Sequence, residues 1–374
     1  MTATFKEIFS LVKDPRVNRT KKHPLLDIIA LSICGIIAGC ESFEEISDFG
    51  KVHKEWFNNF LELPHEIPSH DTFERVFAVL DNNVLQSCCM EWFKQVSQLL
   101  PETVIAIDGK TLRGSARKNK SLKGLHVVNA WSCANSISIG QVKVSDKSNE
   151  ITAIPEILDL LSIKGAIITM DAMGAQKEIV EQIISKDADY VISLKGNQGN
   201  LHNSVKDAFE LYDKGSKVLN MNTANDDIDA DHGRIDERTI EAICTKEFDG
   251  YLGNSFKSLN CVARVKRTTY QNGKKSTESR YYISSLLANE PRKILDATRD
   301  HWQIENNLHW ALDISFNEDG SRIRNENSSM NFSWMRKFAL GLLKKETSFK
   351  ASIRRKQRKA AVNTSYLGKI MRLI

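Results

Sequence analysis

VIAIDGKTLRGS, residues 104–115, is the stretch that decides the fold of this chain. Its first four residues, 104–107, are apolar, and their number and branching favour a buried strand over a helix. Asp108 ends this predicted strand, and Lys110 and Arg113 follow shortly after it. A carboxylate beside a glycine and nearby positive charge could hold a divalent metal ion against a phosphate. The same residues also fit a simple Asp-Gly hairpin turn, so the choice depends on partner carboxylates downstream.

A second apolar run repeats this pattern further along the chain. Residues 167–170, IITM, are followed directly by Asp171. From residue 104 onward the sequence predicts three strands, a helix, a strand, a helix and a strand, which indicates a mixed α/β sheet with helices on its faces. Neighbouring strands would bring Asp108 and Asp171 to one sheet edge, where two carboxylates repel each other unless a cation lies between them. A divalent metal ion explains the pair, and two unrelated surface turns are the alternative.

A long helix near the end of the chain supplies a third acidic residue. Apolar residues recur at spacings of three and four over 291–312, and Glu305 stands next to Ile304 in the buried stripe. His301 and His309 lie four residues on either side of Glu305. Zinc proteases place their two histidines one helical turn apart, whereas these are two turns apart. We therefore expect structural or phosphate-contacting histidines and not a zinc site.

The remaining segments predict a three-part organisation. Residues 1–100 form a helical domain, in which Ser42 and Glu45 have the spacing of a capping box. Its role is DNA binding or purely structural. Residues 101–345 form the α/β domain, with an all-β insertion at about 228–288 that contains an Asn-Gly hairpin signal. Residues 346–374 form a basic tail.

Composition narrows the setting of the protein. The chain has 374 residues, of which 41% are hydrophobic and 26% charged, so it can bury at least one full core. Ten Lys or Arg residues between 344 and 374 oppose a single Glu, which suggests a polyanionic partner or a merely solvated tail. Seven cysteines without framework spacing favour a reducing compartment. Residues 28–40 are too short an apolar run to span a bilayer, and no signal sequence is evident, so we expect a cytoplasmic protein without membrane contact.

Several long motifs, in this order, resemble those of the bacterial insertion-sequence DDE transposases, with the H-repeat-associated proteins as the nearest subfamily. The resemblance extends over essentially the whole chain. The motifs are SFEEISDFGK, SHDTFERVF, DGKTLRGS, ITAIPEILDLL, ITMDAMGAQ, YVISLKGNQG, DHGRIDERTI, HWQIENNLHWALD and RRKQRKA.

The resemblance implies a ribonuclease-H-like catalytic domain with a DDE triad of Asp108, Asp171 and Glu305, spaced 63 and 134 residues apart. It also implies two Mg²⁺ ions per active site, with Mn²⁺ as a substitute, and double-stranded DNA as the partner, both as element ends and as target. A homodimer on DNA is expected. The chain departs from related transposases at two positions: His301 and Leu312 replace an Arg four residues before the Glu and a Lys seven after it.

Basic residues are the candidates for contact with DNA phosphates, although each could be an ordinary surface charge. They are Lys110, Arg113, Lys195, His232 and Arg234, with Arg322 and Arg324 as substitutes for the missing pair. The expected activity is metal-dependent cleavage of element ends, at the nucleoid of a bacterial cell, and strand transfer into target DNA. Two alternatives are a transposase-derived DNA-binding protein that no longer mobilises an element, and a plain metal-dependent nuclease.

Overall fold

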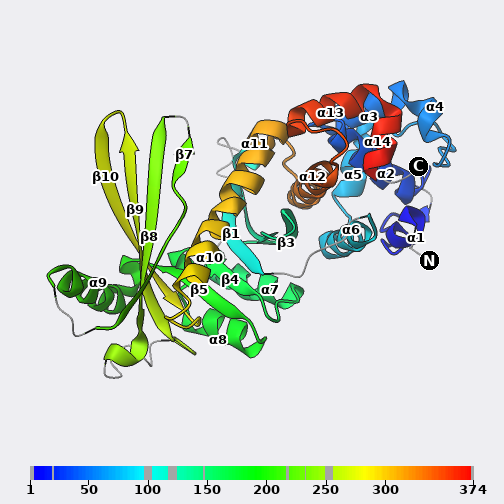
Figure 1. Ribbon diagram of the computed structural model, residues 1–374. Coiled ribbons are helices and arrows are strands. Elements are labelled where there is room, and N and C mark those ends of the chain that lie inside the picture. The colour runs from blue at the N-terminus through cyan, green and yellow to red at the C-terminus, as the bar shows by residue number, and fades with distance from the viewer. Residues whose placement is uncertain are drawn as a thin grey trace.

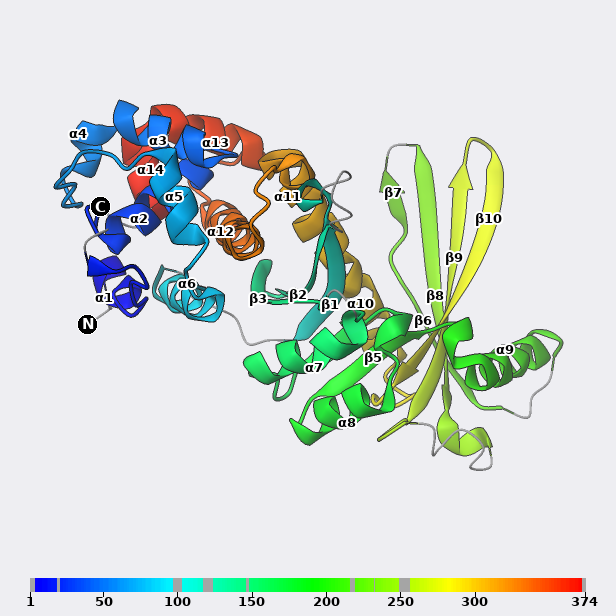
Figure 2. The ribbon, with the colours of Figure 1, turned by 180° about the vertical axis from the view of Figure 1, so that it is seen from behind.

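Helices from both ends of the chain pack together at one side of the protein (Figures 1 and 2). The computed structural model describes residues 4–18, 21–96, 103–116, 124–145, 148–215, 219–231, 233–248 and 256–371. The N-terminal helices are α1 Phe5–Phe9, α2 Leu25–Ile37, α3 Phe43–Val52, α4 Lys54–Phe57, α5 His70–Phe77 and α6 Asn82–Val96. The C-terminal helices are α12 Glu326–Lys345, α13 Ile353–Val362 and α14 Thr364–Met371. Helix α2 is buried along almost its whole length and contacts α3, α12, α13 and α14.

Residues 353–371 are folded, whereas the sequence suggests a basic tail over 346–374. Helix α13 is amphipathic: Ala360 is buried, while Arg354, Arg355 and Arg358 are exposed. Lys356 is buried as well, and its ammonium donates hydrogen bonds to the backbone oxygens of Leu343 and Glu346. These basic residues therefore belong to a helix that packs on the helical region, with the three arginines on its outer face and Lys356 buried.

A mixed sheet forms the body of the protein, as the sequence predicts. Its strand order is β3-β2-β1-β4-β5-β10-β9-β8-β6, and β7 pairs with β8. Strands β1, β4 and β5 are parallel, and all other pairs are antiparallel. The first five strands are β1 Val104–Leu112, β2 Leu125–Ser132, β3 Ile137–Lys143, β4 Ile167–Met170 and β5 Asp189–Leu194. Helices α7 Glu150–Leu160 and α8 Lys177–Ser185 lie between β3, β4 and β5 in the chain.

The two faces of β1 belong to different hydrophobic cores. Val104 and Ala106 join the core that contains α12 and the later helix α10 Pro291–Gln303. Ile105 and Ile107 join the core under α7 and α8. Because side chains alternate along a strand, Asp108 and Lys110 continue the first face. The side chains of Asp108 and Lys110 are therefore directed towards the predicted long helix over residues 291–312.

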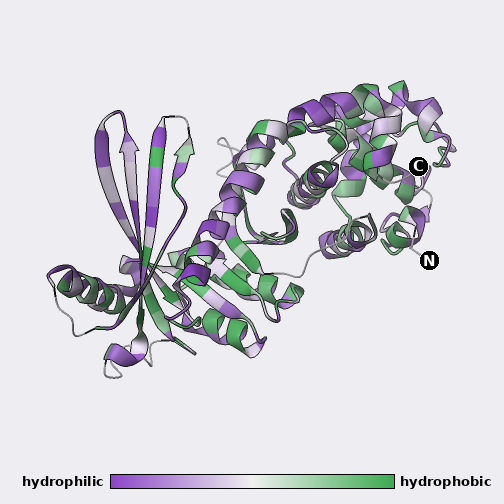
Figure 3. Ribbon diagram, in the orientation of Figure 1, coloured by the Kyte–Doolittle hydropathy of each residue, from purple (hydrophilic) through white to green (hydrophobic). Residues whose placement is uncertain are grey.

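The strands after β5 extend the same sheet instead of forming a separate one. They are β6 Met221–Asn225, β7 Asp229–Asp231, β8 Arg234–Cys244, β9 Cys261–Gln271 and β10 Lys274–Ser284, and β10 pairs with β5. The outer ends of β8–β10 project from the body and are largely hydrophilic (Figure 3). Asn272 and Gly273 have φ angles of 52° and 73°, as a type I′ hairpin turn requires. Helix α9 Gly199–Asp213 precedes this strand-rich segment, and α10 follows it.

The predicted long helix is interrupted at its centre. Helix α10 Pro291–Gln303 runs into a π-helix, η7 Ile304–His309, which is followed by α11 Trp310–Phe316. A π-helical turn inserts one residue and is common at functional sites.

The predicted capping box is only half formed: Ser42 accepts a hydrogen bond from Glu45 N, but the Glu45 carboxylate accepts one from Glu41 N. In the described part of the chain, no helix is both long and apolar enough to cross a bilayer.

Candidate active site

Asp108 and Asp171 occupy matching positions on neighbouring parallel strands. The last parallel pair of β1 and β4 is Ile107 with Met170, and an aspartate follows each of them. Asp108 is not at the end of its strand, because β1 continues to Leu112 through its pairing with β2. The divergence of β4 from β1 at this point opens the sheet beside both carboxylates.

Asp171 caps a short helical turn directly after β4. It is the N-cap residue of η4 Ala172–Gly174, and its Oδ1 accepts a hydrogen bond from Met173 N at 2.9 Å. Asp108 and Asp171 both line a cavity of about 580 Å³, together with Glu305, His301 and Lys195. The structure thus brings the three acidic residues of the predicted triad to one cavity.

Glu305 lies in the π-helical turn, and His309 holds its carboxylate. His309 Nδ1 donates a hydrogen bond to Glu305 Oε2 at 3.0 Å and lies 3.6 Å from Asp108 Oδ2. One ligand atom from each of Asp108, Glu305 and His309 lies within 4.8 Å of the other two. This donor set of two carboxylates and one imidazole fits a divalent cation. The spacing of four residues between Glu305 and His309 predicts a structural or phosphate-contacting histidine, whereas the structure places His309 beside the two carboxylates.

The acidic groups differ in their electrostatic environments. Burial raises the pKa of Asp108 to about 6, and the charges of Glu150 and Asp171 add to this effect against the opposing charge of His309. Burial also raises the pKa of Asp171. The hydrogen bond from His309 lowers the pKa of Glu305, whose side chain is half exposed. Because Asp108 and Asp171 both resist ionisation, a bound cation would stabilise their charged forms.

Glu150 is a further carboxylate beside the site that sequence reasoning missed. It begins α7, and its Oε1 lies 2.8 Å from His126 Nε2. A Cβ atom at residue 109 would lie 2.0 Å from Glu150 Oε1, so a larger residue there would displace this carboxylate from its present position. Gly109 therefore permits the close approach of a third negative charge to Asp108, which its place in a predicted turn did not suggest.

Lys110 is a buried structural cation. Its ammonium donates hydrogen bonds to the backbone oxygen of His309 at 3.1 Å and to Asp313 Oδ1 at 2.6 Å, and lies 3.3 Å from Glu318 Oε2. Two of its three donors are thus hydrogen-bonded, and the ion pair with Glu318 adds a second negative charge beside the ammonium. The sequence suggests a phosphate contact for Lys110, but this placement fixes β1 to the π-helical turn instead.

The other basic candidates lie in three different places. Lys195 is exposed at the cavity mouth, where its charge opposes the rise in the pKa of Asp171. Arg113 is exposed and lies near Asp319, while Arg322 and Arg324 are exposed on the segment that follows. A Cβ atom at residue 114 would lie 2.1 Å from Ser321 O, so Gly114 lets this segment pack against the end of β1. His232 lies outside the described residues.

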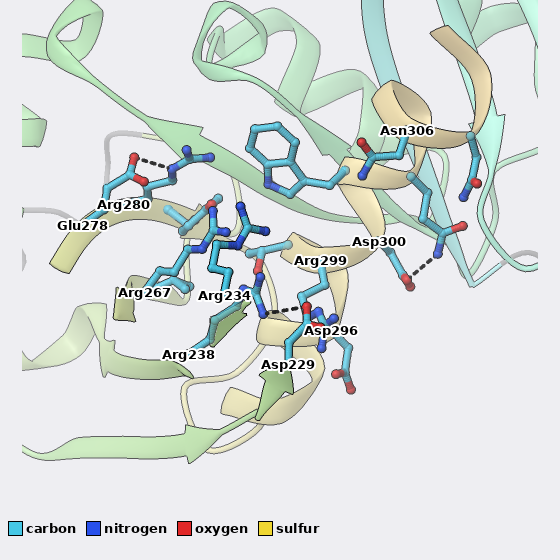
Figure 4. A pocket seen from close by; sticks show the side chains of 16 residues that line it. Asp229, Arg234, Arg238, Arg267, Glu278, Arg280, Asp296, Arg299, Asp300 and Asn306 are labelled. Carbon is cyan, nitrogen blue, oxygen red and sulfur yellow. Dashed lines mark hydrogen bonds and ion pairs between the residues drawn. The ribbon is translucent and has the colours of Figure 1, made fainter. Parts of the chain in front are cut away.

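Arg234 belongs to a second cavity, of about 840 Å³, beside the first (Figure 4). We call it the arginine pocket, because five arginines from β8, β9, β10 and α10 line it: Arg234, Arg238, Arg267, Arg280 and Arg299. Arg234, Arg238 and Arg267 share the buried carboxylate of Asp236. Arg280 stacks on the Trp302 ring at 4.9 Å, and both residues line the two cavities.

Arg238 lies in a network of charges in the arginine pocket: Nη1 is 3.9 Å from Asp226 and 3.7 Å from Asp229, and Nη2 is 3.6 Å from Asp236. Burial lowers the pKa of Arg238, and repulsion from Arg299 and Arg267 lowers it further, against the attraction of Asp236 and Asp229. Arg238 Nη1 and Arg267 Nε are buried without a hydrogen-bond partner among the described residues. An anion such as a phosphate group would therefore be stabilised there.

Comparison with known proteins shows the family of this chain. Residues 99–342 match the family model described as "Transposase DDE domain", and residues 6–93 match "DDE_Tnp_1-associated". The chain is 40% identical to the "H repeat-associated putative transposase YhhI" of Escherichia coli K12, over 98% of this chain and 97% of that protein. It is 39% identical to the "Putative transposase YncI" of Escherichia coli O157:H7, over 98% and 93% of the two chains.

Among solved structures, the cryo-EM structure of the piggyBac transposase synaptic complex with hairpin DNA aligns with a TM-score of 0.42 and 11% identity, over 98% of this chain and 76% of that one. That likeness is too weak to define the fold. The family-model match and the relatives that align over nearly their whole length are sufficient to assign the family. The chain therefore belongs to the DDE transposases, in their H-repeat-associated subfamily.

Proposed function

We propose that this transposase cuts DNA at the ends of its element and joins the released 3′ ends to target DNA, with Asp108, Asp171 and Glu305 as the catalytic carboxylates. One observation carries the proposal: two aspartates stand side by side where β1 and β4 part, and Glu305 lines the same cavity. Residues that lie far apart in sequence and converge in this way fit a shared metal site.

The metal is Mg²⁺ in this proposal, with two ions per site and Mn²⁺ as a substitute. Carboxylate oxygens are the ligands that Mg²⁺ prefers, and Asp108 and Glu305 lie within 4.8 Å of each other at their ligand atoms. Bound Mg²⁺ would activate the attacking oxygen and neutralise charge on the leaving 3′ oxygen. Lys110 would support the site by holding β1 and the π-helical turn together.

The DNA strand would run from the cavity lined by Asp108, Asp171 and Glu305 into the arginine pocket. The two cavities share Arg280 and Trp302, so a backbone whose reactive phosphate lies at Asp108 can place flanking phosphates beside Arg234. Lys195 would contact the same backbone at the cavity mouth. These cations would supply the salt-dependent part of DNA affinity.

Two finer features complete the proposal. We assign the unit β3-β2-β1-β4-β5 to the ribonuclease-H-like fold, because three antiparallel strands are followed by two that are parallel to β1.

Because an element has two ends to be joined, we also propose a homodimer on DNA. Mass measurement of the complex with paired end DNA would test the homodimer.

A strand-transfer assay tests the function. The full-length protein, Mg²⁺, a labelled element end and a supercoiled target plasmid should yield end DNA joined to the plasmid. Asp171→Asn should abolish joining, and Asp207→Asn, an exposed aspartate on α9, should leave it unchanged. Cleavage without joining would indicate a plain nuclease, and binding without cleavage would indicate a DNA-binding protein; either result would overturn the proposal.

A further inference from the structure

His309 contacts two members of the triad. Its side chain is 5% exposed, and Nδ1 points at the space between Glu305 Oε2, at 3.0 Å, and Asp108 Oδ2, at 3.6 Å. Backbone support comes from Lys110, which binds the His309 carbonyl oxygen. The imidazole is thus held rigidly, with one nitrogen directed at both carboxylates.

The other nitrogen of His309 faces a buried amide. His309 Nε2 lies 3.5 Å from Asn129 Nδ2, and Asn129 pairs with Asp108 in the register of β1 and β2. Asn129 is fully buried, and its Oδ1 has no hydrogen-bond partner among the described residues. A half-turn of the amide would place Oδ1 opposite Nε2, where it could accept a hydrogen bond from Nε2–H. Metal-binding histidines commonly donate their second N–H to such an oxygen.

The spacing of the donor atoms suits a single ion. Ligands about 2.1 Å from a six-coordinate ion stand about 3 Å apart when adjacent and about 4.2 Å apart when opposite. The measured separations of 3.0 and 3.6 Å from His309 Nδ1, and the upper limit of 4.8 Å for the whole group, are compatible with this geometry after small side-chain adjustments.

We propose that His309 Nδ1 is a ligand of the divalent ion held by Asp108 and Glu305, and that Asn129 orients its ring. This inference rests on the proposed function. An imidazole ligand favours Mn²⁺ and Co²⁺ over Mg²⁺, because nitrogen donors bind transition metals better than they bind Mg²⁺. The site would therefore prefer Mn²⁺ to Mg²⁺ more strongly than an all-carboxylate site would.

A purely structural role for His309 makes a different prediction. In that case Nδ1–H would only fix the Glu305 carboxylate, and the bound ion would have oxygen ligands alone. Nitrogen coordination to the metal separates the two roles without any measurement of activity.

Pulsed electron paramagnetic resonance of Mn²⁺ bound to the full-length protein, without DNA, detects a directly coordinated ¹⁴N nucleus. Wild type should show this coupling. His309→Gln should lose it and should weaken Mn²⁺ binding roughly tenfold or more, while Mg²⁺ binding falls less. His202→Gln and His301→Gln alter the two histidines that line the cavity itself, and both variants should keep the coupling.

The outcomes separate the inference from the proposed function. Wild type without ¹⁴N coupling, or coupling that is lost in His301→Gln and kept in His309→Gln, would overturn the inference; the wild-type measurement needs no variant to fold. Asp108→Asn tests the underlying site: its Mn²⁺ affinity should collapse. If Asp108→Asn binds Mn²⁺ as wild type does, the metal site of the proposed function is itself wrong.

Discussion

Asp108 and Asp171 occupy equivalent positions relative to β1 and β4. The parallel pairing of these two strands ends at Ile107 and Met170, and each aspartate is the next residue in its chain segment. The pairing of β1 with β4 therefore brings both aspartates to the same region of the sheet. Glu305 reaches the same cavity from a helical turn that has its own support through Lys110 and His309. Two ligands thus depend on the sheet and the third depends on helix packing.

Asp108 should destabilise the metal-free protein above acidic pH. Its pKa rises from 3.8 to about 6 on folding, so the folded state binds the proton more tightly and stability falls as pH rises through this range. In a chelator, Asp108→Asn should raise the free energy of unfolding at pH 8 by at most about 3 kcal/mol, and the gain should vanish below about pH 4. Denaturant unfolding at several pH values measures this. A gain that does not change with pH would contradict the assignment.

Lys110→Met should destabilise the fold. The substitution leaves Asp313 and the buried Glu318 without their shared cation, and breaking a buried ion pair costs about 3–5 kcal/mol. Thermal and denaturant unfolding would measure the loss. Lys206→Met, which removes an exposed lysine paired with Glu210 on α9, is the control and should change stability by less than about 1 kcal/mol. Equal stabilities for the two variants would contradict the structural role of Lys110.

The arginine pocket should contribute to DNA affinity. Arg280→Gln removes a cation that lies between the two cavities, so affinity for end DNA should fall and the salt dependence should decrease by about one counterion. Lys164→Gln, at a surface lysine paired with Asp187, is the control. A salt titration followed by fluorescence anisotropy gives both quantities. An unchanged slope for Arg280→Gln would show that Arg280 contacts no phosphate.

Helix α13 should have separable roles in folding and in DNA binding. Deleting residues 350–374 removes the buried Lys356 and should destabilise the helical region. Replacing Arg354, Arg355 and Arg358 with Gln should keep the fold, since these residues are exposed, but should weaken DNA binding and flatten its salt dependence. Circular dichroism measures the folding of both variants, and the same salt titration measures DNA binding by the triple variant. Wild-type affinity in the triple variant would exclude a DNA contact by this helix.

Local patterns predict much of the sheet and its acidic residues. The run IITM before Asp171 is short, apolar and branched, and it forms β4 as expected. The role of Lys110 could not be predicted in this way, because its partners Asp313 and Glu318 lie some two hundred residues away in the chain. Nor does a three-to-four-residue periodicity reveal the π-helical turn at Ile304, since one inserted residue hardly alters the apolar pattern.

Cleavage by Asp108→Asn tests the central claim most directly. The substitution keeps the size of the side chain but removes the charge that holds the metal ion, so cleavage of a labelled element end in Mg²⁺ should fall roughly a thousandfold or more. Binding of the same DNA in Ca²⁺ should stay close to wild type, because affinity rests on phosphate contacts elsewhere on the protein. Asp207→Asn should cut at the wild-type rate. If Asp108→Asn also cuts at nearly the wild-type rate, Asp108 does not hold the catalytic metal and the proposed active site is wrong.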